Sequence, residues 1–420
     1  QAWLPALNSR FILHADGLAK ILVLLTAISF PAIFIATANN QPKQKNIFLS
    51  LLLFTQAGLM GVFLAGDALL FYFFWELALI PVYFLSSIWG GEKRIAVTFK
   101  FFIYTFLGSL FMLIGIVMLY MHTADHSFLI ESFMKASLSK GQQLTAFVLF
   151  FIAFAIKMPI FPLHTWQPDA YEQSPTTVTM VLSAVMVKMG LYGVIRWLLP
   201  LFPMAAHSMS AVIIDLSVIG VLYASFIAIR QDDMKRLIAY SSIAHIGLMN
   251  AALFTHNTIG MQGVLIQLFS HGINVLGLWI VADMIEQQTG SRSLKTMGGL
   301  ATKRPTLAIL FIGFSLANIA LPLTNAFVGE FLIFNSLFQY NILIAAIAGI
   351  SVVLSAIYTL NMIQKVAYGE VSVTINNMST TNKYAQLVLI FLLAIVFVTG
   401  VYPAPLFNLT ADTLQQMFVK

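Results

Sequence analysis

Long apolar stretches alternate with short polar connections along the whole chain. Twelve stretches reach about 20 residues, the length that an α-helix needs to cross a bilayer, and none shows the alternation of a membrane β-strand. The predicted spans are residues 18–38, 46–66, 68–89, 95–121, 144–163, 176–199, 206–229, 233–254, 257–283, 305–338, 341–367 and 384–403. Because backbone amides in lipid need internal partners, the pattern predicts an all-α polytopic membrane protein with a single transmembrane domain over residues 1–420.

Composition supports the same class of protein. The chain is 59% hydrophobic, has a mean hydropathy of +0.88, and is only 9% charged, against about 25% in soluble proteins. A water-soluble surface cannot be built from that supply, so disorder, coiled coil and a basic nucleic-acid-binding domain are excluded. The absence of Cys removes disulfides, thiolate metal sites and iron–sulfur ligation. The chain begins at Gln1 rather than Met, so we expect residues to be missing before it.

Basic residues are distributed unequally between the two sides of the predicted bundle. An even number of spans places both termini on one side. The connections on the opposite side hold thirteen basic residues: Lys43, Lys45, Lys93, Arg94, Arg230, Lys235, Arg236, Arg292, Lys295, Lys303, Arg304, Lys365 and Lys383. The side of the termini holds five: Arg10, Lys20, Lys135, Lys140 and Lys420. The positive-inside rule therefore predicts that both termini face away from the cytoplasm.

Six titratable residues lie inside predicted spans; the two lysines and two glutamates have strongly apolar neighbours, and the two histidines have hydroxyl or amide neighbours. Burying such groups in hydrocarbon costs several kcal/mol, so each is a functional candidate. They are Glu76, Lys157, Lys188, His245, His271 and Glu330. Acids, lysines and histidines on six helices of one bundle are what a lateral proton relay requires, because neighbours can shift the pKa of each. The competing interpretation is a set of buried ion pairs that fixes helix register.

Other charged residues within the spans have simpler interpretations. Lys100 and Arg196 lie near helix ends, where their long side chains are expected to reach the headgroup region. Lys235, Arg236 and Asp169 are interpreted as loop or helix-end anchors. Asp215 lies deeper, in the sequence IIDLSVIG, and its role stays open.

Two spans contain helix breaks. Pro159 and Pro162 follow Lys157 in KMPIFP, which cannot continue as a regular helix. Residues 317–327, which contain Pro322, interrupt the span that leads to Glu330. Non-helical backbone at membrane depth is tolerated where it lines a cavity or is buried by protein, so both breaks are candidates for a transport site.

The positions of the breaks indicate an internal repeat. Residues 46–200 and 206–367 each contain five spans, and the broken span is the fourth in both blocks. The two blocks start on opposite sides of the membrane, which predicts two inverted five-helix repeats with a broken helix in each. Residues 384–403 then form a final peripheral helix.

Several long stretches resemble the antiporter-like subunits of respiratory complex I and related proton pumps. The resemblance runs from about residue 3 to about residue 409. It rests on FFWELALIPVYFL, AFAIKMPIFPLHTWQPDAYEQSPT, VLSAVMVKMGLYGVIR, DDMKRLIAYSSIAHIGLM and ALPLTNAFVGEF. The family has fourteen helices, and the resemblance implies that the first two precede this sequence.

The resemblance implies a role for each buried group. Glu76 matches the acid that pairs with Lys157 on the first broken helix. Lys188 resembles a bridging lysine, and His245 and His271 match a polar central axis. Glu330 matches the outlet group on the second broken helix, where several relatives have Lys.

The resemblance also implies the setting in which the chain works. It would be a proton-translocating subunit of the bacterial inner membrane, in contact with lipid and with other antiporter-like membrane-arm subunits, and it would not bind nucleic acid. It would hold no cofactor of its own; NADH, FMN, iron–sulfur clusters and quinone are expected in partner subunits.

Three alternatives remain open at the level of sequence. The chain could be part of a sodium–proton antiporter, or of a related pump with another electron donor. It could also be an inert scaffold whose charged groups only fix helix packing.

Overall fold

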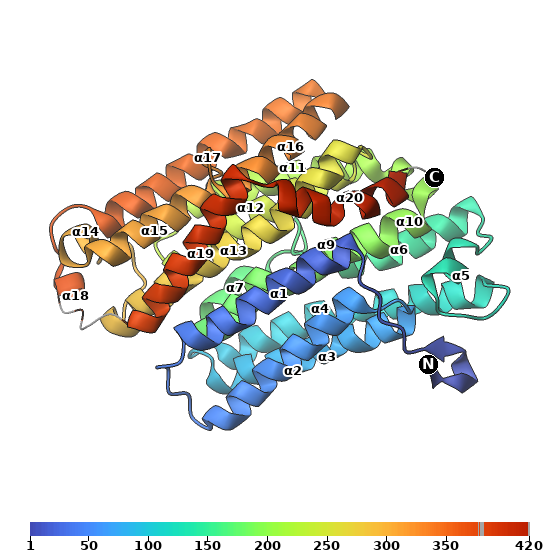
Figure 1. Cartoon of the computed structure of the whole chain (residues 1–420), viewed down its shortest axis with the longest axis horizontal. Coiled ribbons are helices and arrows are strands. Elements are labelled where there is room, and N and C mark those ends of the chain that lie inside the picture. Colours follow the sequence, from blue (N-terminus) through green and yellow to red (C-terminus); the bar gives the residue numbers. More distant parts are fainter. Residues whose placement is uncertain (377, 379–381, 419–420) are drawn as a thin grey trace.

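A computed structural model describes residues 1–376, 378 and 382–418. Helices fill each of the twelve predicted spans, and the fold is the predicted helical bundle (Figure 1). The membrane-crossing part contains α1 (Gly17–Ala36), α2 (Lys45–Leu64), α3 (Ala68–Trp89), α4 (Arg94–His122), α6 (Lys140–Lys157) with α7 (Trp166–Gln173), α8 (Thr176–Val181) to α10 (Leu199–Leu201), α11 (Pro203–Arg230), α12 (Met234–Leu253), α13 (Thr258–Thr289), α15 (Pro305–Asn318) with α16 (Asn325–Tyr340), α17 (Ile342–Ala367) and α19 (Lys383–Val401).

Nine helical segments of the described chain are long and apolar enough to cross a membrane on composition alone. The predicted spans outside that set are α6, α12 and the broken pair α15–α16. α12 has polar residues, including Ser241 and Ser242, along a helix that is buried over most of its length. A helix surrounded by protein can carry polar groups that lipid would not tolerate, because neighbouring helices supply hydrogen-bond partners.

The remaining elements are short and lie at the ends of the bundle. They are β1 (Ala2–Leu4), η1 (Pro5–Leu7) and β2 (Ser9–Arg10), which form a small antiparallel hairpin, and α5 (Ile130–Met134), α14 (Leu300–Lys303) and α18 (Val373–Asn376). The loops with α14 and α18 lie at one end of the long axis. The N-terminal hairpin and α5 lie at the other, together with the end of the last helix (Figure 1).

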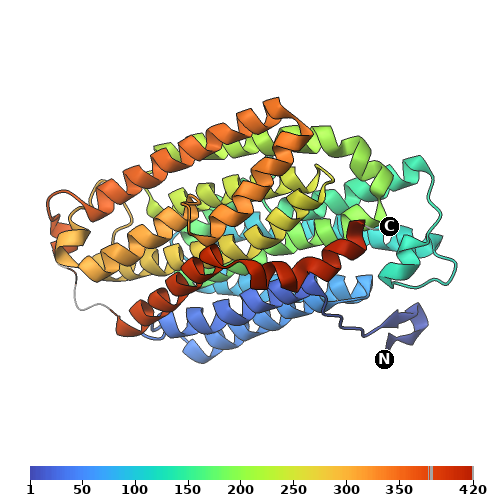
Figure 2. The same cartoon turned by 45° about the horizontal axis from the view of Figure 1, so that its top comes forward.

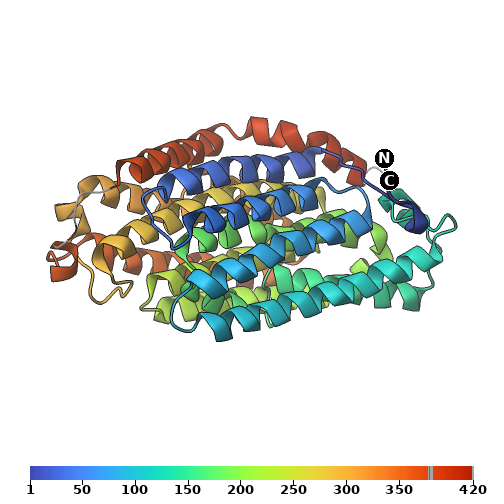
Figure 3. The same cartoon turned by 90° about the horizontal axis from the view of Figure 1, so that it is seen from below.

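That last helix, α20 (Ala404–Phe418), follows α19 and is absent from the predicted set of elements. It packs against α1: the backbone N–H of Gly17 donates to the hydroxyl of Thr413 at 2.8 Å. α1 consequently lies between α2 on one side and α19 and α20 on the other (Figure 3). The α20 sequence is too polar for a span, and short amphipathic helices are hard to recognise beside the strong signals of membrane helices.

Acidic and amide side chains start many of the helices. Asp67 accepts hydrogen bonds from the backbone N–H groups of Leu69 and Leu70, and Asp233 caps α12 in the same way. Ser139 and Gln142 form a reciprocal capping box at the start of α6. These residues satisfy backbone donors that have no partner within the helix, at points where the polar connections end.

The centre of the bundle consists of α12, α13 and the helical segment from Thr176 to Leu201. The most apolar 18 residues of α13 and of the segment Thr176–Leu201 are all buried, whereas 28% of the corresponding stretch is buried in each of α17 and α19. α11 and α17 lie side by side along one edge (Figure 2). Exposed residues of these outer helices are predominantly apolar, as contact with lipid requires.

Both breaks occur in the fourth span of their block. α6 ends at Lys157, Pro159 and Pro162 lie in the turns that follow, and α7 begins at Trp166. α15 ends at Asn318, and α16 begins at Asn325 after the segment that contains Pro322. The division of the chain into two inverted repeats stays a prediction that agrees with these positions.

Helix packing depends on glycine where two backbones come close. A Cβ added at Gly58 of α2 would lie 2.5 Å from the backbone N of Ala78 in α3. By contrast, a Cβ at Gly349 of α17 would meet nothing within 4 Å. The Gly58→Ala exchange should therefore destabilise the protein by about 1–3 kcal/mol through overpacking.

Thermal unfolding of the detergent-solubilised protein would measure this effect, with Gly349→Ala as the matched control. Equal melting temperatures for the two variants would contradict the close contact of α2 with α3.

Candidate functional site

Lys188 lies at the centre of the bundle and is fully buried. Its Nζ donates to the backbone carbonyl of Ser183 at 2.6 Å and lies 2.9 Å from Nδ1 of His271. The π-helical turn Leu182–Met186 directly precedes it. This wider turn brings Lys188 to the same side as Ser183, five residues earlier, a local irregularity typical of functional positions in helices.

His271 of α13 connects Lys188 to the next helix. Its second ring nitrogen, Nε2, lies 3.2 Å from the hydroxyl of Ser242 in α12. The ring of His245, also in α12, lies with its centroid 5.5 Å from that of His271. Each nitrogen of the His271 ring thus faces a different polar neighbour, which is the arrangement that lets an imidazole accept a proton on one side and release one on the other.

His245 in turn contacts the second broken helix. Its Nδ1 lies 2.8 Å from Oε1 of Glu330, and the side-chain amide of Gln267 donates to the same oxygen at 3.3 Å. Both His245 and Glu330 are buried, with 7% and 8% of their surface exposed. Four of the six predicted residues, from four helical segments, therefore form one connected series.

A small pocket lies beside the His245–Glu330 pair, between α11 and α17. Its volume is about 10 Å³, the space of roughly one water molecule. Its polar lining includes His245, Glu330, Ser225, Ser351, Ser355 and Tyr358. The pair therefore has a hydrophilic side although it lies in the middle of an apolar bundle.

Lys157 and Glu76 lie apart from this series. Lys157 has 1% of its surface exposed, and its Nζ has no hydrogen-bond partner and lies 5.6 Å from the ring centroid of Trp75. One oxygen of Glu76 is also buried without a partner. No ion pair joins Glu76 and Lys157 in the structure, and the indole ring of Trp75 is a cation–π partner of Lys157.

α6 and α9 (Lys188–Gly193) meet between the two lysines. A Cβ at Gly190 would lie 2.6 Å from the carbonyl oxygen of Phe154 and 2.7 Å from the backbone N of Met158. Glycine thus lets the helix of Lys188 pack directly against the end of the helix of Lys157.

Three polar residues near this contact were not expected from the sequence. The fully buried hydroxyl of Tyr171 lies next to Gln167 and Ser183, and all three side chains have polar atoms without a hydrogen-bond partner. Buried polar groups are normally paired with protein or ordered water. Unpaired polar groups therefore lie next to Ser183, whose carbonyl accepts the hydrogen bond from Lys188.

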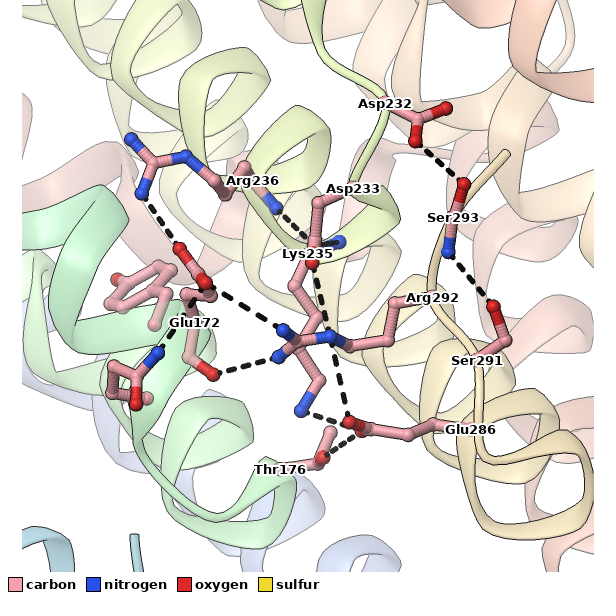
Figure 4. Close-up of polar contacts among 12 residues, drawn as sticks. Glu172, Thr176, Asp232, Asp233, Lys235, Arg236, Glu286, Ser291, Arg292 and Ser293 are labelled. Carbon is pink, nitrogen blue, oxygen red and sulfur yellow. Dashed lines mark hydrogen bonds and ion pairs between the residues drawn. The ribbon is translucent and has the colours of Figure 1, made fainter. Parts of the chain in front are cut away.

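Charged residues form a cluster at the end of the bundle that holds most basic loops (Figure 4). Glu172 accepts a hydrogen bond from Arg236 at 2.7 Å and lies 3.6 Å from Arg292. Arg292 also contacts Asp233 at 3.0 Å, and Lys235 pairs with Glu286 at 2.6 Å. The cluster joins α7, α12 and α13 with the loop after α13.

Asp169 extends this cluster to α4. It accepts hydrogen bonds from Lys100 at 2.9 Å and from Arg236 at 3.1 Å. Lys100 therefore has a carboxylate partner within the protein, and whether its side chain also reaches the headgroup region stays a prediction.

A cavity of about 970 Å³ adjoins the charged cluster. Its lining includes Lys45, Lys235, Asp283 and Glu286. Asp283 is 5% exposed and accepts a hydrogen bond from Asn40 at 3.3 Å, while its other oxygen has no partner. Polar space thus reaches into the bundle from the end that carries the basic loops.

Arg196 lies in a second ion pair. Its guanidinium pairs with Asp16 and donates to the hydroxyl of Tyr192 at 3.3 Å, partners that the sequence did not indicate. Burial raises the pKa of the Asp16 carboxyl, but Arg196 outweighs that effect and holds the pKa below its ordinary value. The pair anchors the start of α1 to the central helical segment.

Among the residues that the structure describes, no group of three or more His, Asp or Glu side chains could hold a metal ion. The site is therefore described by its buried titratable residues, with a small polar pocket beside Glu330 and a larger cavity beside the charged cluster.

Comparisons with known proteins agree with this arrangement. Residues 65–357 match the family model described as NADH:quinone oxidoreductase/Mrp antiporter, TM. The chain is 38% identical to NADH-quinone oxidoreductase subunit M of Rhodobacter capsulatus, over 99% of this chain and 83% of the relative. It is 35% identical to subunit M of Escherichia coli K12, over 99% and 85%.

Solved structures are similar as well. A chain of respiratory complex I from Thermus thermophilus superposes with a TM-score of 0.91 at 28% identity, over 99% of this chain and 87% of that one. A chain of the Mrp complex from Dietzia sp. DQ12-45-1b has a TM-score of 0.87 at 18% identity, over 96% and 84%, which shows a common fold.

The charged cluster should contribute to stability. Replacing Glu172 with Gln removes the carboxylate between Arg236 and Arg292, whose side chains are 28% exposed. The expected loss is about 1–2 kcal/mol, between the values for exposed and for buried pairs. Chemical denaturation of the solubilised protein would measure it.

Glu92→Gln is the matched control, because Glu92 is exposed and forms no ion pair. A loss of stability that is equal in the two variants would show that the cluster is not specifically stabilising.

Proposed function

The chain belongs to the NADH:quinone oxidoreductase/Mrp antiporter family of membrane subunits, and on that premise we propose that it moves protons through a line of buried side chains. It is an antiporter-like membrane-arm subunit of complex I, assembled with other such subunits. The proposed line contains Glu76, Lys157, Lys188, His271, His245 and Glu330.

The continuous contact from Lys188 to Glu330 is the observation that carries this proposal. Its three links are Lys188 to His271 at 2.9 Å, His271 to His245 across rings 5.5 Å apart, and His245 to Glu330 at 2.8 Å. A scaffold needs only that its charges be neutralised. A series of weak acids and bases, each within reach of the next, additionally allows proton exchange.

Lys188 and His271 are expected to share one proton. Two positive charges at 2.9 Å in an apolar site repel strongly, so protonation of both is unfavourable. When the Lys188 ammonium donates to Nδ1 of His271, the imidazole becomes doubly protonated and can release the proton on Nε2. Ser242 and the His245 ring lie on that side. Glu330 then accepts the proton from Nδ1 of His245.

Lys157 would load this series. Its ammonium is favoured by the negative charge of Glu76 and disfavoured by burial. Any movement that separates Glu76 from Lys157 removes the favourable interaction of the ammonium with the Glu76 carboxylate. The proton then leaves Lys157 for an acceptor such as neutral Lys188. Tyr171, Gln167 and Ser183 lie where water molecules would complete that step.

The orientation of the chain in the membrane is inferred from the basic loops. We infer that the end with the charged cluster faces the cytoplasm of a bacterial cell, where the 970 Å³ cavity would admit protons. Both termini would face the opposite side. Reactions of NADH, FMN, iron–sulfur clusters and quinone would take place in partner subunits, and conformational change would transmit their free energy to the Glu76–Lys157 region.

Replacement of Lys157 by Ala tests the proposal. The rate of proton transfer through this subunit should fall by roughly 10²-fold, the scale for loss of a proton-transferring group, and proton translocation per electron in vesicles that carry the intact complex should fall with it. Lys20→Ala is the matched control, since Lys20 is an exposed lysine of α1. The measurement is vesicle acidification during NADH oxidation, with sodium present and with sodium removed.

Normal acidification by an assembled Lys157→Ala complex would refute the relay and favour a scaffold. A strict requirement for sodium in the unmodified complex would instead favour sodium–proton exchange.

Replacement of Glu330 by Gln tests the far end of the line. The side chain keeps its size and can still hydrogen-bond, but it cannot bind and release a proton. Proton translocation should fall while assembly, followed by native electrophoresis, is unchanged. Glu92→Gln serves as the control. Translocation at the unmodified level would remove Glu330 from the proposed path.

A further inference from the structure

Asp215 is the one acidic residue that is exposed in the middle of a membrane-spanning helix in the described chain. It is the thirteenth of the 28 residues of α11. Its neighbours on the exposed side of the helix are apolar: Val212 and Ile219 are 50% and 52% exposed, and Phe226 is 56% exposed. Within residues 1–376, 378 and 382–418, no hydrogen bond or ion pair involves its carboxylate.

This position is unfavourable for a carboxylate that faces lipid. Transfer of Asp to the centre of a membrane helix costs about 2.5–3.5 kcal/mol on insertion scales. Twelve residues separate it from Pro203, which corresponds to about 18 Å along the helix. The short Asp side chain cannot cover that distance to a headgroup, in contrast to Lys or Arg.

The exposed side of α11 that carries Asp215 lies next to the first broken helix. Tyr223, 40% exposed, has its ring 5.3 Å from Phe161 and 5.2 Å from His164, both in the break that follows Lys157. A partner that packs on Asp215 would therefore also reach this break.

We propose that a membrane-embedded helix of a neighbouring subunit packs on this surface of α11 and places a Lys or Arg side chain against Asp215. Charge complementarity favours this occupant: a cation at the same depth neutralises the carboxylate, and each group lowers the cost of burying the other. The same helix would contact Tyr223 and so lie next to the break at Lys157.

The proposal does not depend on the proton path. It concerns how this chain associates with its neighbours, and it can hold even if Lys157 and Lys188 have no role in transport.

Carbodiimide labelling tests the proposal directly. Dicyclohexylcarbodiimide is apolar and modifies protonated carboxyl groups within bilayers. In the intact complex Asp215 should be protected, because the neighbouring helix covers it and its cation contacts the carboxylate. In the subunit separated from its neighbours by detergent and returned to lipid, Asp215 should be accessible and labelled. Peptide mass spectrometry would measure the labelling of Asp215 separately from that of Glu76 and Glu330.

The other labelling outcomes would each overturn the proposal. Equal labelling in both preparations means that Asp215 faces lipid in the complex. Protection in both preparations means that another part of this chain covers it.

Variants provide a second measurement. Asp215→Asn removes the charge with little change in size, and it should lower retention of this subunit in the complex by at least about tenfold during mild detergent treatment. Asp215→Lys should lower it further, because two cations would then face each other. Ile390→Asn, at an exposed position on α19, controls for adding an Asn to a lipid-facing helix. Full retention of both Asp215 variants would refute the ion pair.

Discussion

Polar groups inside the membrane must find their partners within the protein, and the rest of this structure depends on that constraint. Most of the chain meets it with helices whose outer surfaces are apolar. The few exceptions are concentrated around α12, α13 and the segment from Thr176 to Leu201, which lipid does not reach. The π-helical turns Leu182–Met186 and Val194–Leu198, which would be costly on an outer helix, are accommodated at this centre because neighbouring helices surround them.

The centre combines rigid packing with incomplete hydrogen bonding. Gly190 lets α9 lie directly against the end of α6, so the positions of Lys157 and Lys188 are linked through backbone contact. In the same region the polar atoms of Lys157, Gln167 and Tyr171 lack partners. A well-packed frame around unsatisfied polar groups suits proton movement, since the frame fixes distances while the free donors and acceptors leave room for water.

Charged residues at the two ends of the bundle are joined in ion pairs. Glu172, Arg236 and Arg292 tie helix ends together where water can reach them, and Arg196 with Asp16 does the same at the opposite end. The interior instead holds the Lys188–Glu330 series, in which a lysine, two histidines and a glutamate lie next to one another. Ion pairs thus stabilise the ends of the bundle, and buried titratable groups occupy its interior.

The sequence by itself determined the class of protein, the positions of the spans, the two breaks and the identity of the buried titratable residues. These features follow from local composition: lipid demands apolar helices, proline interrupts them, and a lone charge among apolar residues stands out. The tertiary structure decided which groups meet. Lys188 contacts His271, 83 residues away, only because a π-helical turn and the packing of α13 align them. Packing likewise separates Glu76 from Lys157 and gives Arg196 a partner in Asp16. It also brings Tyr171 next to Ser183, whose carbonyl accepts the hydrogen bond from Lys188. Contacts of this kind join residues far apart in the chain, and side-chain distances of a few ångströms depend on how helices pack, which local sequence patterns do not specify.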